Sequence, residues 1–190
     1  MKTLSGIALI LSLLFNSGCG AMLSAVDSEP IGDDSGERTY GARMDDESIE
    51  TKATVNIHAA DPGFDDAHLN VISYNSYVLM VGQVPSQALK DKASEVVREI
   101  RRVRRIYNEL EVTGNVSLLT RSSDTWITSK IKTTLLASSE TEGNRVKVVT
   151  ENGVVYLMGL ATHAEAERIA DTASASYGVR KVVRLFEYID

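Results

Sequence analysis

The sequence has a single cysteine, Cys19, and no segment that is long and apolar enough to span a membrane. Its N-terminal apolar segment, Ile7 to Phe15, has nine residues, whereas a helix that spans a bilayer needs about 20. No glycine-rich phosphate loop, Cys/His metal cluster or paired-carboxylate motif can be placed in it, and its three histidines are scattered. These absences argue against a catalytic protein, and we expect no metal and no cofactor.

The chain also lacks the positive charge of a general nucleic-acid binder, because its formal net charge is −6. We therefore expect no nucleic-acid partner. An apolar content of 43% and a charged content of 24% are typical of a globular protein. The 190 residues are enough for one domain or for two small ones.

The N-terminus has the features of a secretory signal peptide. Lys2 precedes the apolar segment, and the small residues Ser17 and Gly18 lead to Cys19. This order resembles a bacterial lipobox, which implies that residues 1–18 are removed and that Cys19 is lipidated; the alternative is a free thiol without a role. With Cys19 lipidated, no thiol remains for a disulfide, so the folded part must be stable by packing alone. Several acyl chains on one residue would attach the protein firmly to a membrane.

Acidic residues are concentrated after this segment. Nine of them occur between Asp27 and Glu50, against only Arg38 and Arg43. With Pro30 and several Gly and Ser residues, this composition is typical of a solvated linker. We expect residues 19–44 to comprise the lipidated cysteine and a flexible acidic tether.

The rest of the chain contains an internal repeat. Residues 45–52 match residues 123–130, residues 75–82 match 152–159, and residues 103–110 match 179–186, at offsets of 78, 77 and 76. Two single-residue gaps reconcile these offsets. We therefore predict two copies of one domain, over residues 45–113 and 123–190, joined by a short polar linker at 114–122.

Each copy is predicted to have the order helix, strand, strand, helix, strand. In the second copy, Asp124 is the expected N-cap of a helix that ends at Ala137, and Asn152-Gly153 is the type I′ turn of a hairpin. The predicted ranges of the first copy are 48–59, 69–73, 77–81, 88–101 and 106–112. Those of the second are 124–137, 145–150, 154–159, 164–176 and 182–189.

Four hairpin residues are predicted to have structural roles. Asn152 and Gly153 tolerate the positive φ angles of the turn. Gly82 and Gly159 end equivalent strands, where a glycine allows close packing or an unusual backbone angle. Replacing Gly159 should therefore unfold its domain.

The order of elements and three segments of the second copy, DTWITSKIK, TENGVVYLMGL and GVRKVVRLFEYI, resemble the BON domain family. The first copy departs from this pattern by having Arg102 where the second has Gly178. Two such domains behind a lipobox resemble the dual-BON outer-membrane lipoproteins of the DolP (YraP) type. The resemblance implies an α+β fold of two tandem αββαβ domains, each with a small three-stranded mixed sheet packed by two helices.

The same resemblance implies a non-enzymatic protein that is attached to the outer membrane and faces the periplasm. It further implies binding of an anionic phospholipid such as phosphatidylglycerol, support of outer-membrane integrity and enrichment at the division site. Partners would be proteins of outer-membrane protein assembly or of cell-wall remodelling. The lipid-binding element would be the first helix of the second domain.

That helix has two contrasting faces when it is drawn at 100° per residue. Ile127, Ile131 and Leu135 form an ordinary core face, whereas Trp126 and Leu136 point the other way between two lysines. An indole favours the membrane interface, and lysines would face headgroup phosphates. The predicted phospholipid-binding residues are Trp126, Ser129, Lys130, Lys132, Thr133 and Leu136.

Two alternatives remain for this face. Trp126 could pack against the other domain, or Trp126 and Leu136 could bind an envelope protein as an adaptor surface. In the first copy the positions of Trp126 and Leu136 are Ser48 and His58, so only the second copy has this apolar outer face.

The run from Arg98 to Arg105 (REIRRVRR) contains five arginines. We favour a solvated helix end, where cations also suit the helix dipole, over a second contact with lipid phosphate or an acidic partner. His163, which opens the predicted helix at 164–176, is expected to be solvated surface.

Overall fold

The computed structural model describes residues 36–114, 117–138 and 141–190. The elements of the first domain are α3 (Tyr40–Ala60), the 3-10 helix η1 (Pro62–Phe64), β1 (His68–Tyr74), β2 (Tyr77–Val84), α4 (Gln87–Arg98) and β3 (Arg105–Val112). β1 and β2 are antiparallel, and β3 joins β2 in parallel, so that β2 is the central strand of a mixed sheet.

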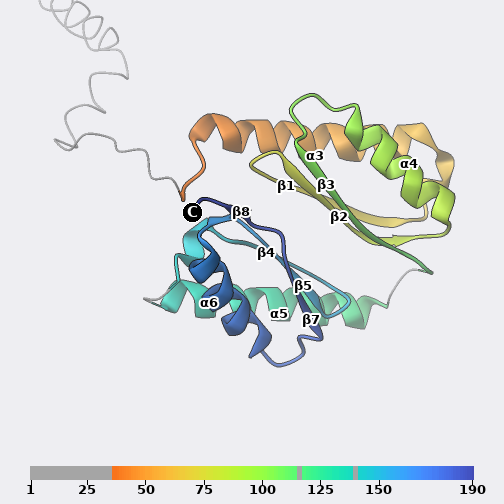
Figure 1. The fold of residues 1–190 in the computed structure, drawn as a ribbon. Helices are drawn as coiled ribbons and strands as arrows, with labels where there is room; N and C mark the ends of the chain where they lie inside the picture. The colour runs from red at the N-terminus through yellow and green to blue at the C-terminus, as the bar shows by residue number, and fades with distance from the viewer. Residues whose placement is uncertain (1–35, 115–116, 139–140) are drawn as a thin grey trace, which may run out of the picture. The chain divides into compact units, whose positions relative to one another are not determined.

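The second domain repeats this order. Its elements are α5 (Leu118–Ala137), η2 (Gly143–Arg145), β4 (Lys147–Glu151), β5 (Val154–Met158), β6 (Leu160–Ala161), α6 (His163–Ser174), β7 (Lys181–Arg184) and β8 (Glu187–Tyr188). β5 takes the central place between antiparallel β4 and parallel β7, and the two short strands β6 and β8 continue the pairing beyond Gly159. The predicted α+β fold of two αββαβ domains with three-stranded mixed sheets is confirmed (Figure 1).

The first helix of each domain begins earlier than the sequence pattern predicts. α3 begins at Tyr40 and α5 at Leu118, and each is preceded by an N-cap hydroxyl, of Thr39 and Ser117, that accepts a backbone N–H three residues on. The end of the predicted tether and the end of the predicted linker are therefore helical. These turns were missed because the core stripe of each helix begins with an aspartate instead of an apolar residue.

Asp124 is that aspartate in α5, and the prediction that it is the N-cap is wrong. It lies inside the helix and is only 6% exposed. Its two carboxylate oxygens accept the backbone N–H groups of Asn152 and Gly153, each at 2.8 Å. These are the central residues of the hairpin turn, with φ angles of 49° and 71° as a type I′ turn requires. Asp124 thus fixes the β4–β5 hairpin to α5.

Asp46 does the same in the first domain. Its oxygens accept the backbone N–H groups of Asn75 and Ser76, again at 2.8 Å. Both turn residues have positive φ, 49° and 66°, although neither is a glycine. Buried turn amides need such partners, so the aspartate of each repeat is part of the fold.

The helices of each domain pack on one face of that domain's sheet (Figure 1). In the first domain this core includes Ile49, Ile57, Phe64, Val78 and Met80. In the second it includes Ile127, Ile131, Leu135, Val155 and Leu157.

The other faces of the two sheets share a third apolar cluster. Its buried members are Ile72, Tyr74, Leu79 and Val81 from the first domain and Tyr156, Met158 and Leu185 from the second. The central strands β2 and β5 are therefore covered on both faces, which accounts for the unbroken apolar runs at residues 77–82 and 154–158. The layers run helix, sheet, sheet, helix, and residues 35–190 form one unit.

Polar contacts also join the two domains. The Tyr74 hydroxyl donates to the carbonyl of Arg145 at 2.6 Å, and the side chain of Gln83 donates to Glu151 at 2.7 Å in a buried pair. At the other end of the contact, Glu187 accepts hydrogen bonds from the first domain, as described below.

Gly82 and Gly159 are both closely packed, but only Gly82 also has an unusual backbone angle. Gly82 has a φ of +122°, and a Cβ atom there would lie 2.0 Å from the carbonyl oxygen of His68 on the paired strand. Gly159 has no such φ, but a Cβ atom there would lie 3.1 Å from the carbonyl oxygen of Arg145 and 3.2 Å from the Phe186 ring. Gly159 follows the last residue of β5, as predicted, whereas the prediction that Gly82 ends its strand is wrong, because β2 continues to Val84.

The first domain keeps the backbone conformation at the position where its sequence departs from the second. Arg102 has a φ of 78°, against 90° for Gly178. A non-glycine residue in this left-handed region is strained by about 1–2 kcal/mol. The two loops nevertheless have the same course, which supports their alignment in the repeat.

Candidate functional site

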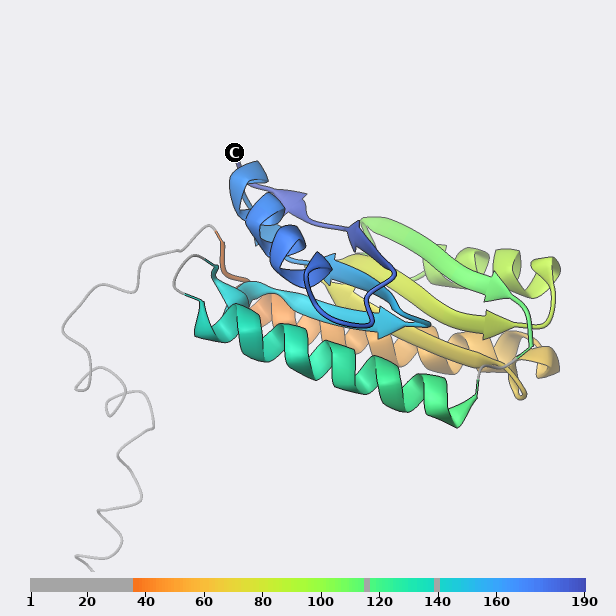
Figure 2. The ribbon, with the colours of Figure 1, turned by 90° about the horizontal axis from the view of Figure 1, so that it is seen from below.

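α5 has the inner face that its sequence predicts. Ile127, Ile131 and Leu135 are at most 2% exposed and belong to the core of the second domain. The helix runs along its sheet from one end to the other (Figure 2). Because these three residues fix the rotation of the helix, the side opposite them is held outward.

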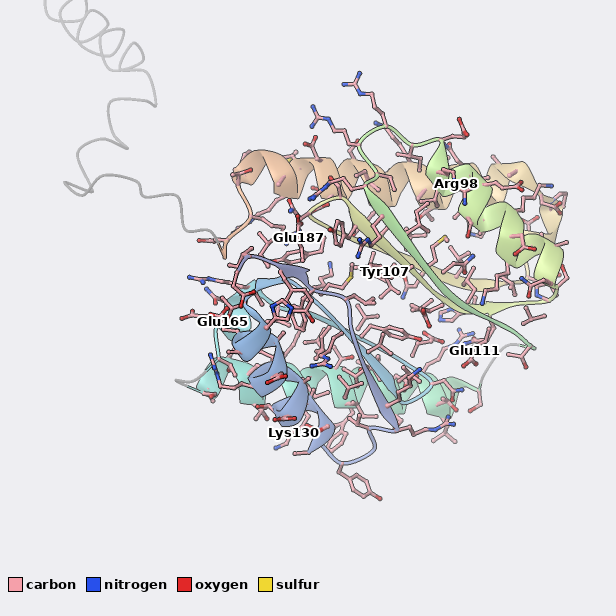
Figure 3. The ribbon with its side chains drawn as sticks, in the orientation of Figure 1. Arg98, Tyr107, Glu111, Lys130, Glu165 and Glu187 are labelled. Carbon is pink, nitrogen blue, oxygen red and sulfur yellow. The ribbon has the colours of Figure 1, made fainter. Side chains whose placement is uncertain are left out.

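The outward side is in solvent. Trp126 is 53% exposed and Leu136 is 63% exposed. Lys130 lies on α5, far from Tyr107, which lies in the layer between the two domains (Figure 3). All six predicted residues are exposed, and we call them the outer face of α5: Trp126, Ser129, Lys130, Lys132, Thr133 and Leu136.

Two residues of the outer face use their hydroxyl protons within the helix. Ser129 donates to the carbonyl of Thr125 and Thr133 to the carbonyl of Ser129, both at 2.9 Å. With their protons used in this way, the two hydroxyl oxygens can only accept a further hydrogen bond. A phosphate diester group has no proton to donate, so neither hydroxyl can bind it. Attraction of an anion to this face therefore falls to Lys130 and Lys132.

Trp126 takes no part in the contact between the domains. It is outside the apolar cluster that the two sheets share, and the indole lies on the side of α5 away from that cluster. The structure gives no support to the alternative in which Trp126 packs against the first domain. Its exposure needs another explanation.

Leu119 extends the outer face and was missed by the sequence analysis. It is 83% exposed and lies seven residues, or two helical turns, before Trp126, so both point to the same side. The sequence contains the signal, because Leu119, Trp126 and Thr133 have heptad spacing. It was overlooked because the helix was predicted to begin only at Asp124.

The arginine run is divided among three settings. Arg98 is in the last turn of α4, as a solvated helix end would require. Arg102 forms an ion pair with Asp45, and Arg104 forms two hydrogen bonds with Glu187 of the second domain, at 2.7 and 3.0 Å. Part of the run is therefore structural, and the helix-end interpretation holds for Arg98.

The histidines are not gathered into a site. In the described ranges, no group of three or more His, Cys, Asp or Glu side chains is placed to hold a metal ion. His163 is exposed, as expected, and its hydrogen bond holds the pKa of the Asp190 carboxyl below its usual value. The neighbours are Phe64 for His58, Glu151 for His68, and Tyr188 with Asp190 for His163.

The residue predicted to attach the chain to a membrane, Cys19, lies outside the described residues. Within the described part of the chain, no helix combines the length and the apolar character that crossing a membrane requires.

Both domains match one known family. The BON domain family matches residues 45–114 and 123–190, which contain most of the elements of the two αββαβ units described above. The chain therefore belongs to the BON domain family.

Full-length relatives narrow this assignment. Outer membrane lipoprotein DolP of Haemophilus influenzae is 33% identical over 198 aligned residues, which cover 100% of this chain and 99% of the relative. The 21 kDa hemolysin of Actinobacillus pleuropneumoniae is 36% identical over 80% of this chain and 78% of its own length. Osmotically-inducible protein Y of Escherichia coli is 29% identical over 95% and 92%. The chain is a dual-BON protein of the DolP type.

Proposed function

We propose that this chain is a non-enzymatic, lipid-anchored protein of the outer membrane, facing the periplasm, whose second BON domain binds anionic phospholipid through the outer face of α5. The exposure of Trp126 and Leu136 beside Lys130 and Lys132 carries this proposal. Tryptophan and aliphatic side chains with flanking lysines are typical of helices that lie in the interface of an anionic membrane.

Comparison of the two domains supports the same site. At the positions of Trp126 and Leu136, α3 has Ser48 and His58. The exposed side of α3 also carries Glu47, whereas α5 has no acidic residue after Asp124. Two copies of one fold thus differ in the features that an anionic membrane would attract.

Attachment to the outer membrane rests on the N-terminus and on the relatives. The predicted signal peptide and Cys19 support a lipid anchor, and the Haemophilus relative is named an outer membrane lipoprotein. Each cation near an anionic surface contributes about 1 kcal/mol, so the two lysines alone would give weak, salt-sensitive docking. A tethered domain needs no more, because the anchor keeps its local concentration high.

The biological role that fits such a protein is support of outer-membrane integrity at the division site. The acidic tether would let the domains reach the periplasmic leaflet of the outer membrane. Binding of α5 there would depend on the local content of anionic lipid. Through that position the protein would assist outer-membrane protein assembly or cell-wall remodelling.

A different role follows if Trp126 and Leu136 bind a protein. An exposed tryptophan is also a common hot spot of protein interfaces. Lipid docking through lysines should weaken steeply with ionic strength and require anionic headgroups, whereas docking through a buried tryptophan should depend less on both.

Trp126 fluorescence tests the proposal directly, because the chain has no other tryptophan. The soluble chain from Ala21 onward would be titrated with phosphatidylglycerol micelles and with zwitterionic micelles. We expect a blue shift with the anionic lipid alone, which disappears in Lys130→Glu and at high salt. Lys52→Glu, at the equivalent position of α3, is the matched control and should behave as the wild type.

The absence of a shift with either lipid would contradict lipid binding by α5. Crosslinking from the position of Trp126 in cells would then look for a protein partner.

A further inference from the structure

A second exposed apolar residue lies in the second domain, away from the outer face of α5. Tyr177 is 87% exposed and occupies the loop 175–180 between α6 and β7, which we call the α6–β7 loop. Nothing in the fold of the domain requires a tyrosine there, because the side chain contributes to none of the three apolar clusters.

The α6–β7 loop is fixed against α5. A Cβ atom at Gly178 would lie 3.1 Å from the Cδ1 atom of Ile127, so the loop backbone rests on the side of the helix. A groove of about 330 Å³ runs between the two elements, and Leu119, Ile127, Gly178 and Arg180 contribute to its lining. The α6–β7 loop, which carries Tyr177, therefore lies beside the N-terminal half of α5, across this groove from Leu119.

The equivalent loop of the first domain provides an internal comparison. At the repeat offset of 76, Tyr177 corresponds to Arg101 and Gly178 to Arg102, and the backbone has the same left-handed residue in both loops. An apolar loop tip is thus confined to the domain that also exposes Trp126.

The charges around the loop favour an anionic surface. Arg180 and Lys181, three and four residues after Tyr177, are exposed, so cations lie near the apolar tip as they do near Trp126. The neighbouring helix α6 instead exposes two acidic residues, Glu167 and Asp171, and one cation, Arg168, so its exposed side has a net negative charge, which an anionic membrane would repel. These charges would turn α5 and the α6–β7 loop toward the membrane and α6 away from it.

We infer that Tyr177 is a second membrane contact, which enters the interface of an anionic bilayer together with the outer face of α5 and fixes the tilt of the second domain. The inference rests on the proposed lipid binding and adds a separate element to it. A tyrosine suits this position because its ring is apolar and its hydroxyl remains in the headgroup region. Two contacts on one rigid domain also bind more tightly than either alone.

Single-cysteine variants test the inference. The chain from Ala21 onward has no cysteine and retains the whole unit of residues 35–190. Tyr177→Cys would be labelled with an environment-sensitive dye and mixed with vesicles of phosphatidylglycerol or of phosphatidylcholine. We expect a blue shift and brighter emission with phosphatidylglycerol only. Arg101→Cys, the same loop position in the first domain, is the matched control and should show neither change.

Trp126 fluorescence in the same samples separates the possible failures. If Trp126 responds and the dye at position 177 does not, the second contact is wrong and lipid binding by α5 stands. If neither responds, both proposals fail. Equal responses at positions 177 and 101 would also overturn the inference.

An unlabelled variant provides an independent measurement. Tyr177→Ser should weaken binding to phosphatidylglycerol vesicles about three- to tenfold, because one interfacial aromatic is lost. Tyr40→Ser, which removes an exposed tyrosine from the first domain, should leave binding unchanged. Equal binding by Tyr177→Ser and the wild type would contradict the inference.

Discussion

At the scale of single residues, two buried aspartates explain how each helix is connected to its hairpin. Asp46 and Asp124 each satisfy two turn amides that would otherwise be buried without a partner. An N-cap aspartate and an aspartate that binds a turn look alike in sequence, because both precede an apolar helical stripe. The two roles nevertheless differ in the substitutions of the aspartate that they tolerate.

Asp124→Asn separates the two roles. At an N-cap, Asn is as good as Asp, so the substitution would be nearly neutral. In the observed geometry one carboxylate oxygen is replaced by an NH₂ group that faces a turn N–H, and we expect a loss of about 2 kcal/mol. Urea unfolding followed by Trp126 fluorescence measures this in the second domain.

Ser117→Ala is the companion to this experiment, since it removes the observed N-cap and should cost about 1 kcal/mol. A loss below about 0.5 kcal/mol in Asp124→Asn would mean that the turn amides are satisfied without the second oxygen.

At the scale of elements, strong periodicity made prediction reliable. The stripe of Ile127, Ile131 and Leu135 and the Asn152-Gly153 turn identified α5 and the β4–β5 hairpin because local spacing determines both. The same stripe placed the six outer-face residues in solvent. The starts of the helices and the position of the α6–β7 loop could not be predicted from local spacing. They depend on contacts between residues distant in sequence, such as the contact of Gly178 with Ile127.

The equivalent strands β2 and β5 should differ in how they tolerate a methyl group. Gly82→Ala would place Cβ against a backbone oxygen of the paired strand at a φ that L residues avoid, so we expect a loss above about 4 kcal/mol. Gly159→Ala meets the Arg145 carbonyl oxygen at 3.1 Å and the Phe186 ring at 3.2 Å, contacts that a shift of a few tenths of an ångström relieves. It should therefore lose about 2 kcal/mol, which is less than the complete unfolding expected from the sequence alone.

Denaturant unfolding monitored by circular dichroism compares the two alanine variants. A greater loss in Gly159→Ala than in Gly82→Ala would show that the backbone contact at β2 relaxes more easily than the geometry indicates.

At the scale of the whole molecule, the contact between the two domains could not be predicted from the sequence pattern. The unbroken apolar runs of β2 and β5 imply that both faces of each sheet are covered, but they do not say by what. The structure shows that each sheet covers the other through Leu79, Tyr156 and their neighbours. This arrangement leaves α5 and α6 on the far side of the second sheet, where the outer face of α5 is free to meet another surface.

The contact between the domains should weaken in acid through Glu187. Arg104 and Asn75 of the first domain donate to its carboxylate, at 2.7 and 2.6 Å for the shortest bonds. Burial alone would raise the pKa of Glu187, but the hydrogen bonds from Arg104 and Asn75 outweigh it and hold the pKa below its usual value. A pKa lower in the folded than in the unfolded state gives stability that is present above the unfolded pKa, about 4.3, and is lost as the pH falls through the folded pKa.

Glu187→Gln measures this contribution. It should reduce the free energy of unfolding at pH 7 by about 1 kcal/mol, a modest value because Arg104 is half exposed and solvent screens the pair. The variant and the wild type should converge as the pH falls through the folded-state pKa of Glu187, because the wild-type carboxylate takes up a proton there. Glu167→Gln, on the exposed side of α6, should show no such convergence because it changes little at any pH of the titration. A deficit of Glu187→Gln that stays the same over the whole acid titration would assign its effect to packing and would remove the ionic contact from the account of how the two domains are held together.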